Sequence, residues 1–410
     1  MTVTPDAEAL RIRRLVALYG LTVFATNLAA RSLDPILPEI ARDFAVGMDT
    51  AALLASAFAL PYALIQPFLG PVGDALGKRR VITVAAALTG TALLACALAP
   101  ALGFLFLARA LAGAAAGGIY PLVIATFGDR VSLAHRQVAL SRISAFGMGG
   151  QIAGGILSGL VHGVVDWRGI IAGGATMVLA VWVVLWLDLR REPDQPPGRL
   201  DGAAALRRYR DIIRLPAARL LYISVAVEGV LAFGLFPYLA TLLAVWGIGG
   251  PVQAGLALGA FGAAGVAYTF IARPLLTRLG LAMMLRLAGV LTGLGFSAIA
   301  VTGWSATHGG TPGLWPVVVG MFAIGLGYFG MHNSIQNGVT EVAPKARGST
   351  VALHAFSFFI GQSLGPVLFG TALAALGAPP ALIACGIGML ALGLVLSRKL
   401  GGGGADRPKA

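Results

Sequence analysis

The chain has 410 residues, of which 57% are hydrophobic and 11% are charged, and its mean hydropathy is +0.84. Soluble proteins carry about 25% charged residues, so this composition excludes a soluble globular protein. The net charge of +13 can indicate nucleic-acid binding, but in so apolar a chain it is better explained by cations that face anionic membrane lipids. Cys96 and Cys385 stand alone, and no metal-ligand, phosphate-loop or nucleophile pattern occurs, so the sequence predicts neither an enzyme nor a cofactor.

Apolar segments separated by turn residues predict twelve transmembrane helices, because each crossing needs about 20 apolar residues. The segments 229–272, 287–340 and 348–397 contain no charged residue, and each is long enough for two crossings. Gly and Pro near their middles, as at 249–251, indicate where each segment turns. In chain order, the predicted spans are 14–36, 51–71, 80–100, 102–127, 139–161, 169–189, 217–246, 251–273, 281–304, 314–338, 349–374 and 379–397.

The distribution of Lys and Arg predicts the orientation. The first apolar stretch is too long for a signal-peptide core and lacks a small-residue cleavage site, so it is expected to stay as a span. With the amino terminus inside, 26 of the 30 basic residues fall on cytoplasmic segments, as the positive-inside rule requires. The remaining four are Arg31, Arg42, Arg109 and Arg168. We expect a multi-pass protein of the bacterial inner membrane with both termini in the cytoplasm.

The sequence predicts that the chain consists of two related halves. A Pro- and Arg-rich segment, 190–216, separates six predicted spans from six. The sequences of 150–159 and 361–370 agree at five of ten positions at an offset of 211, including the glutamines Gln151 and Gln362. The predicted organisation is an amino-terminal six-helix bundle over 1–189, a cytoplasmic loop over 190–216, a carboxyl-terminal bundle over 217–400 and a flexible tail over 401–410. Transporters with such repeats commonly bind solute near the midplane between the halves.

Two motifs carry a family resemblance. The segment 70–80, Gly-Pro-Val-Gly-Asp-Ala-Leu-Gly-Lys-Arg-Arg, resembles the cytoplasmic signature of the major facilitator superfamily, with Ala75 at a position that is usually basic. Arg109 followed by Gly113 is similar to the superfamily's intramembrane motif. The resemblance covers 12–397 and implies an all-α membrane protein with twelve transmembrane helices in two pseudo-symmetric six-helix bundles. It also implies a transporter of a small-molecule substrate, expected to be a monomer.

Two weaker features resemble the twelve-span drug:proton antiporters. These are the sequence 34–40, which begins Asp-Pro, and the glycine spacing of the fifth span, although Gly155 stands where that motif has Pro. Glycines at this spacing also let helices approach closely in any bundle. The resemblance implies proton-coupled export of small amphipathic organic compounds or drugs. Alternatives are proton symport of an organic anion or metabolite, export of a lipid or siderophore type, and a sensor or scramblase on the same fold.

Ionisable residues within spans are costly and mark functional sites by default. Glu228, Asp34 and Arg109 are the candidates for proton coupling. Arg31 can pair with Asp34 at i,i+3, and an arginine there indicates that an anionic or zwitterionic solute could be accepted. His354 is interpreted as a core histidine that a neighbouring helix satisfies.

Polar residues on the predicted inner helices form two further candidate sets. His332 and Gln336 share one helix face, and an offset of 212 relates His332 to Tyr120. The candidates for the substrate cavity are Arg31, Tyr120, Gln151, His332, Asn333, Gln336 and Gln362. The candidates for a cytoplasmic gate, which ion pairs would hold closed, are Gly70, Asp74, Gly77, Lys78, Arg79, Arg80, Asp129 and Arg136.

Overall fold

The structure is a computed structural model that describes residues 5–191 and 202–401, and within these ranges the regular structure is helical throughout. The first half consists of α1 (Pro5–Arg31), the 3-10 helix η1 (Asp34–Ile36), α2 (Leu37–Asp43), α3 (Met48–Leu76), α4 (Lys78–Ala97), α5 (Leu102–Gly117), α6 (Ile119–Arg130), α7 (Leu133–Val161) and α8 (Trp167–Arg191). The second half consists of α9 (Gly202–Arg214), α10 (Pro216–Phe233), η2 (Phe236–Tyr238), α11 (Leu239–Val245), α12 (Pro251–Thr307), α13 (Leu314–Val342), η3 (Pro344–Ala346), α14 (Arg347–Leu376) and α15 (Ala378–Gly401).

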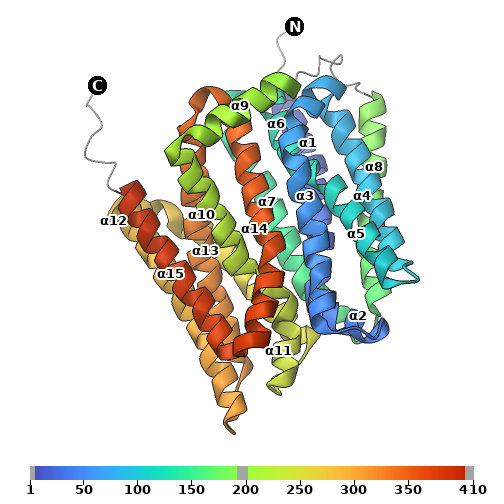
Figure 1. Cartoon of the computed structure of the whole chain (residues 1–410). Helices are drawn as coiled ribbons and strands as arrows, with labels where there is room; N and C mark the ends of the chain where they lie inside the picture. Colours follow the sequence, from blue (N-terminus) through green and yellow to red (C-terminus); the bar gives the residue numbers. More distant parts are fainter. Residues whose placement is uncertain (1–4, 192–201, 402–410) are drawn as a thin grey trace.

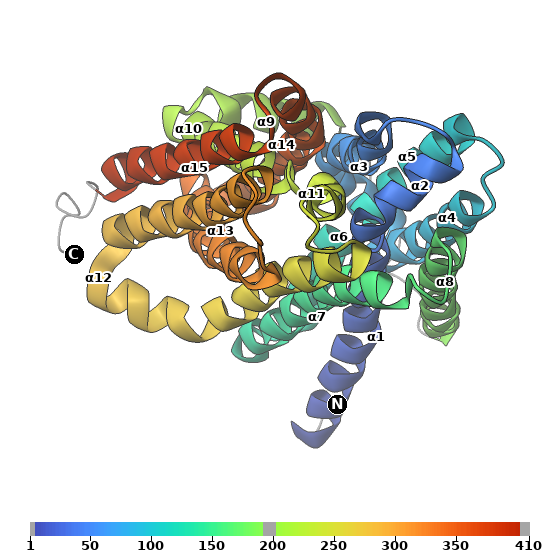
Figure 2. The ribbon, with the colours of Figure 1, turned by 90° about the horizontal axis from the view of Figure 1, so that it is seen from below.

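The described residues form eleven helical segments that are long and apolar enough to cross a membrane. One of them, the 57-residue α12, contains two crossings, because its backbone turns at Gly280, where φ is +73°. Glycine adopts this conformation without the steric cost that a Cβ would add. Figure 2 shows the two arms of α12 meeting at this corner. The twelve predicted spans are therefore confirmed.

The spans form two pseudo-symmetric bundles, α1–α8 and α10–α15, with α9 between them in the chain. Each bundle begins with a span that is interrupted near its end by a short 3-10 helix with proline at its second residue, Pro35 in η1 and Pro237 in η2. Proline lacks an amide hydrogen and therefore favours a helix start at that point. In Figure 1, α9 lies at one end of the molecule, and α2 and α11 lie at the other. These ends are called the α9 end and the α2 end below.

The two bundles contact each other through α7 with α12 and α3 with α14, toward the α2 end. A Cβ on Gly159 of α7 would lie 2.5 Å from the carbonyl oxygen of Pro251, so only glycine permits this approach of the helices. The Ser56 hydroxyl donates to the carbonyl of Ser363 at 2.6 Å. The glycines of the fifth span thus let helices pack closely, which is the alternative to an antiporter motif that the sequence allowed.

Part of the segment predicted as a loop is helical. The α8 helix continues through Arg191, and Gly202–Arg214 forms α9, whose sequence combines basic residues with apolar ones. The buried Ile212 contacts the core of the second bundle, and the Tyr209 hydroxyl donates to the carbonyl of Pro67 in α3 at 2.7 Å. The sequence prediction missed α9 because its many charges resemble those of a solvated linker. Residues 192–201, and all but the first residue of the predicted tail, lie outside the described residues.

Candidate functional site

A small cleft of about 30 Å³ lies between the bundles, and its mostly apolar lining includes three polar side chains from the first bundle and aromatic rings from the second. Arg31, Asp34 and Gln151 contribute from the first bundle, and Phe236 and Phe261 contribute from the second. Three residues that the sequence predicted as functional therefore come together here. The break between α1 and α2 places Asp34 at this position, because η1 turns the chain at the end of the first span.

Arg31 connects the two bundles within this cleft. Its guanidinium lies 3.5 Å from a carboxylate oxygen of Asp34, as expected from their i,i+3 spacing. It also lies over the rings of Phe233 and Phe236, at 4.7 and 5.6 Å from their centroids. A cation over an aromatic face contributes about 0.5–2 kcal/mol, more as water is excluded. Arg31 therefore stabilises the contact between the bundles as well as charging the cleft.

The second polar centre lies within the carboxyl-terminal bundle. Glu228 of α10 is fully buried, and its Oε2 lies 2.8 Å from Nδ1 of His332 in α13. The other carboxyl oxygen, Oε1, has no hydrogen-bond partner among the described residues. A buried carboxylate with one unpaired oxygen is costly, so this pair is favoured when it holds a proton between Oε2 and Nδ1. The structure thus joins a predicted coupling acid to a predicted cavity residue.

His354 of α14 belongs to the same centre. Its imidazole ring lies beside that of His332, with 5.2 Å between the ring centroids, and its side chain is buried. Its Nε2 has no hydrogen-bond partner in the described chain. The interpretation of His354 as a satisfied core histidine is therefore wrong. Sequence reasoning missed this residue because a lone histidine in an apolar span usually serves packing, and its neighbour is 22 positions earlier in the chain.

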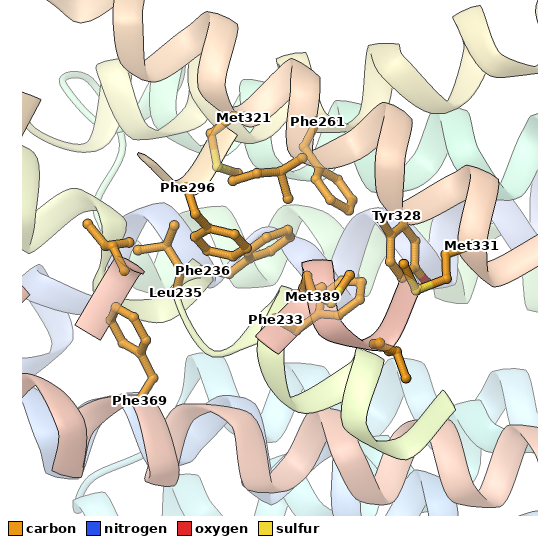
Figure 3. Close-up of a cluster of buried hydrophobic side chains, with 14 of the residues drawn as sticks. Phe233, Leu235, Phe236, Phe261, Phe296, Met321, Tyr328, Met331, Phe369 and Met389 are labelled. Atoms are coloured by element: carbon orange, nitrogen blue, oxygen red, sulfur yellow. The ribbon is translucent and has the colours of Figure 1, made fainter. Parts of the chain in front are cut away.

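Aromatic side chains connect the cleft to this polar centre. Phe233, which contacts Arg31, packs edge-on against Tyr328 with 5.3 Å between centroids, and Tyr328 in turn stacks on His332 at 5.1 Å. Phe261, which lines the cleft, lies 5.4 Å from Tyr328. Figure 3 shows Phe233, Phe261 and Tyr328 grouped in the buried core of this bundle. Packed aromatic rings therefore connect His332 to the cleft wall without a break.

Arg109 of α5 lies elsewhere, inside the amino-terminal bundle. It is 2% exposed, donates to the carbonyl oxygen of Ala30 at 3.0 Å and lies over the ring of Phe58 at 4.5 Å. Both partners belong to its own bundle. Gly113, one turn later, packs against the backbone of Phe58, so the Arg-plus-Gly motif joins α5 to α1 and α3. This geometry favours a role of Arg109 in helix packing.

The remaining predicted cavity residues are dispersed. The Tyr120 hydroxyl is 3.3 Å from the hydroxyl of Ser144, and Asn333 donates to the carbonyl of Phe329 in its own helix. Gln336 is half-buried on α13, one turn from His332 toward the α9 end. Gln362 is buried on α14, and its amide nitrogen has no hydrogen-bond partner within the described ranges. Among the described residues, none of these four side chains forms a hydrogen bond with Glu228 or His332.

The loop between α3 and α4 carries part of the predicted gate. Gly77 adopts φ +89° at the tight turn, and Lys78 contacts Asp74 at 3.0 Å and Asp129 at 2.7 Å. Arg136 donates to backbone carbonyl oxygens near the end of α6. These interactions lie within the amino-terminal bundle. Gly70 and Arg80 are exposed at the same end.

Arg79, which was predicted to belong to the cytoplasmic gate, is buried inside the amino-terminal bundle. Its guanidinium is buried and contacts a carboxylate oxygen of Asp188 in α8 at 2.6 Å, and the second oxygen of Asp188 contacts Arg14 of α1 at 2.5 Å. This network ties three helices of one bundle together. Asp188 was not predicted, although an acid at the end of a span that otherwise lacks acids was a visible signal.

Comparison with known proteins agrees with this architecture. The family described as Major Facilitator Superfamily matches residues 19–366. A Bacillus subtilis (strain 168) protein named as the uncharacterized MFS-type transporter YwfA is 24% identical over 377 residues, which are 92% of this chain and 89% of that protein. The quinolone resistance protein NorA of Staphylococcus aureus (strain MRSA252) is 25% identical over 396 residues, which are 94% and 97% of the two chains.

A further relative and a solved structure are also similar to this chain. The efflux pump dotC of Dothistroma septosporum (strain NZE10) is 34% identical over 151 residues, which are 36% of this chain and 26% of that protein. The crystal structure of the peptide transporter POT superposes with a TM-score of 0.76 at 16% identity and covers 94% of each chain, which shows the shared fold. The chain therefore belongs to the major facilitator superfamily and is a multi-pass membrane transporter, not an enzyme.

Proposed function

We propose that this chain is a proton-coupled exporter of small amphipathic organic compounds, in which the Glu228–His332 pair carries the coupling proton. The observation that supports this most directly is a fully buried carboxyl group hydrogen-bonded to an imidazole. Such a pair has net charge zero while it holds a proton and becomes negative when it loses it, so the cost of burial changes with proton occupancy. A carrier can use this difference to bias its conformations.

The surroundings of the pair support an organic solute. The cleft combines aromatic rings with one arginine and one carboxylate, which suit flat apolar groups with charged ends. Its volume is about 30 Å³ in this conformation, so the bundles would have to separate before such a solute could bind there. Quinolones carry a carboxylate beside an aromatic ring system, and one relative is named for quinolone resistance. We therefore include quinolone-like compounds among the expected substrates. The efflux pump among the relatives supports the export direction.

The orientation that we propose places the α9 end in the cytoplasm, since the basic residues of α9 and of the nearby loops belong on the inner side of a bacterial inner membrane. The bundles contact each other toward the α2 end, which would then be closed to the periplasm. Reporter fusions after residues 45, 165 and 308 should read periplasmic, and those after 78, 205 and 345 cytoplasmic. A cytoplasmic reading at 165 would contradict this orientation.

The transport test uses inside-out vesicles with an acidic lumen that contains a pH-sensitive dye. Addition of a fluorescent quinolone should produce uptake into the lumen together with proton release from it. The variant that tests the pair in this assay is Glu228→Gln. Its matched control is Glu341→Gln, which removes an exposed acid of the carboxyl-terminal bundle that contacts Arg347 at the surface. Proton-independent quinolone uptake would contradict coupling.

Proton symport of an organic anion is the second candidate, and Arg31 in the cleft favours it. In the same vesicles a symporter would carry solute and protons out of the lumen together. Preloaded anion should then leave with the protons, and added quinolone should produce no proton release.

A further inference from the structure

We propose that His354 is a second proton-carrying side chain, which passes protons between the Glu228–His332 pair and the α9 end of the protein. This inference rests on the proposed function of that pair. The starting observation is the adjacency of two imidazoles from different helices, with 5.2 Å between ring centroids and 60° between ring planes. This spacing can bring ring nitrogens within reach of each other, directly or through one water molecule.

The hydrogen-bonding state of His354 supports a role beyond packing. Its side chain is 4% exposed, and its Nε2 lacks a hydrogen-bond partner in the part of the chain that the structure describes. A buried polar atom without a partner destabilises the folded protein. An apolar residue of similar size would avoid this cost, so an imidazole retained here needs another explanation. Proton transfer provides one, because a relay atom must have a free position to receive its proton.

The depths of the three side chains form a series. Counting along the helix from its α9 end at 1.5 Å per residue, Glu228 lies about 18 Å deep in α10, His332 about 15 Å deep in α13 and His354 about 10 Å deep in α14. His354 therefore lies about two turns from the start of α14, whereas Glu228 and His332 lie deeper within their own helices.

The groups around His332 make the path directional. Toward the α2 end, Tyr328 stacks on its ring at 5.1 Å, and Phe358 packs edge-on against it at 4.9 Å. Among the described residues, the titratable groups in ring contact with His332 are Tyr328 from α13 and His354 from α14. On α10, the Tyr222 hydroxyl is occupied by a hydrogen bond to a backbone carbonyl. Rings thus cover His332 on the α2 side, and an imidazole meets it on the α9 side.

The transfer steps conserve protons. A proton that arrives on His354 passes to Nε2 of His332, while Nδ1 of His332 gives its own proton to Oε2 of Glu228. The O–H bond of the carboxyl group forms as the N–H bond at Nδ1 breaks, and both imidazoles end neutral. Release to the α9 end follows the reverse order and restores the original tautomer of His332.

The test measures proton transfer to Glu228 without any solute. In purified protein in nanodiscs, infrared spectroscopy follows the C=O stretch of the protonated Glu228 carboxyl after a jump to lower pH, and Glu228→Gln identifies the band. In His354→Gln the band should grow roughly 100-fold more slowly than in the wild type, while its final amplitude is unchanged. The matched control is His308→Gln, which replaces an exposed histidine stacked on Trp304 and should leave the rate unchanged.

An unchanged rate in His354→Gln would overturn the relay. If that variant does not fold, His354→Met, which keeps similar volume without a titratable group, replaces it with the same expectation. Transport separates the two proposals. Proton-driven quinolone uptake in the wild type together with an unaltered rate in His354→Gln would overturn the relay alone. A slowed rate in His354→Gln together with proton-independent uptake would overturn the proposed function and leave the proton path standing.

Discussion

Arg109 and Glu228 are both buried in membrane spans, one in each bundle, but their surroundings differ. Arg109 has its carbonyl and aromatic partners within its own bundle, and its buried Nε has no hydrogen-bond partner among the described residues. Glu228 shares one oxygen with an imidazole and leaves the other without a partner in the described structure. A guanidinium stays charged, whereas a carboxyl–imidazole pair can gain or lose a proton. We infer that Arg109 serves helix packing in the first bundle and that the Glu228–His332 pair serves coupling in the second.

The largest expected effect is that of Glu228→Gln, which should abolish proton-driven quinolone uptake and leave quinolone binding intact. Glutamine keeps the size and hydrogen-bonding capacity of the protonated acid but cannot exchange a proton. Uptake and lumenal pH in vesicles, together with binding to purified protein, measure the two effects. If this variant keeps wild-type proton dependence, the coupling acid lies elsewhere, and Asp34 in the cleft becomes the leading candidate.

Arg109→Ala should instead lower stability, binding and transport together. The substitution removes a charged hydrogen bond to Ala30 and a contact with the Phe58 ring, at a cost of about 2–4 kcal/mol. Arg109→Lys keeps the charge and should recover part of the stability. Thermal unfolding in detergent with each variant measures this. A variant with full stability and no proton dependence would break the distinction between the bundles, because Arg109 would then act in coupling.

Arg31→Ala should weaken closure at the α2 end. Loss of about 0.5–2 kcal/mol of cation–aromatic attraction would raise the population open at this end about 2- to 30-fold. Val164 and Trp315 are exposed positions, one in each bundle. Spin labels on Val164→Cys and Trp315→Cys, in a background with Cys96 and Cys385 replaced, report the distance between the bundles. Distance distributions that match those of the same labelled protein with Arg31 intact would mean that the other contacts suffice for closure.

The smallest effect is expected for Asp74→Asn. Asp74 is 66% exposed, and Lys78 keeps its contact with Asp129 when Asp74 is neutralised. Exposed ion pairs contribute about 0–1 kcal/mol, so transport should slow by no more than about fivefold, with unfolding unchanged. Asp211→Asn on α9, where an exposed acid contacts Arg210, is the matched control. Equal rates in both variants and the wild type would remove Asp74 from any gate.

The spans could be predicted from the sequence because crossing a bilayer imposes a length and an apolar composition on each helix. The pairing of Arg31 with Asp34 followed from local helix geometry. The contact between Glu228 and His332 could not be predicted, because it joins residues 104 positions apart, and apolar periodicity carries no information about which helices are neighbours. The contact between Arg79 and Asp188 could not be predicted for the same reason, since the two residues are 109 positions apart. Lys78, Arg79 and Arg80 were all predicted to belong to the cytoplasmic gate, yet adjacent helix positions point in different directions.

The contact of Arg31 with Phe233 has a consequence for the history of the chain. The 3-10 helices η1 and η2 align at an offset of 202, since Asp34 corresponds to Phe236, and the same offset relates Arg31 to Phe233. Arg31 therefore stacks on its own counterpart, as a residue on the two-fold axis of a homodimer meets its copy. Identical halves would place two arginines, or two phenylalanines, face to face here. The cation–aromatic contact at this position therefore depends on the two halves having different residues there.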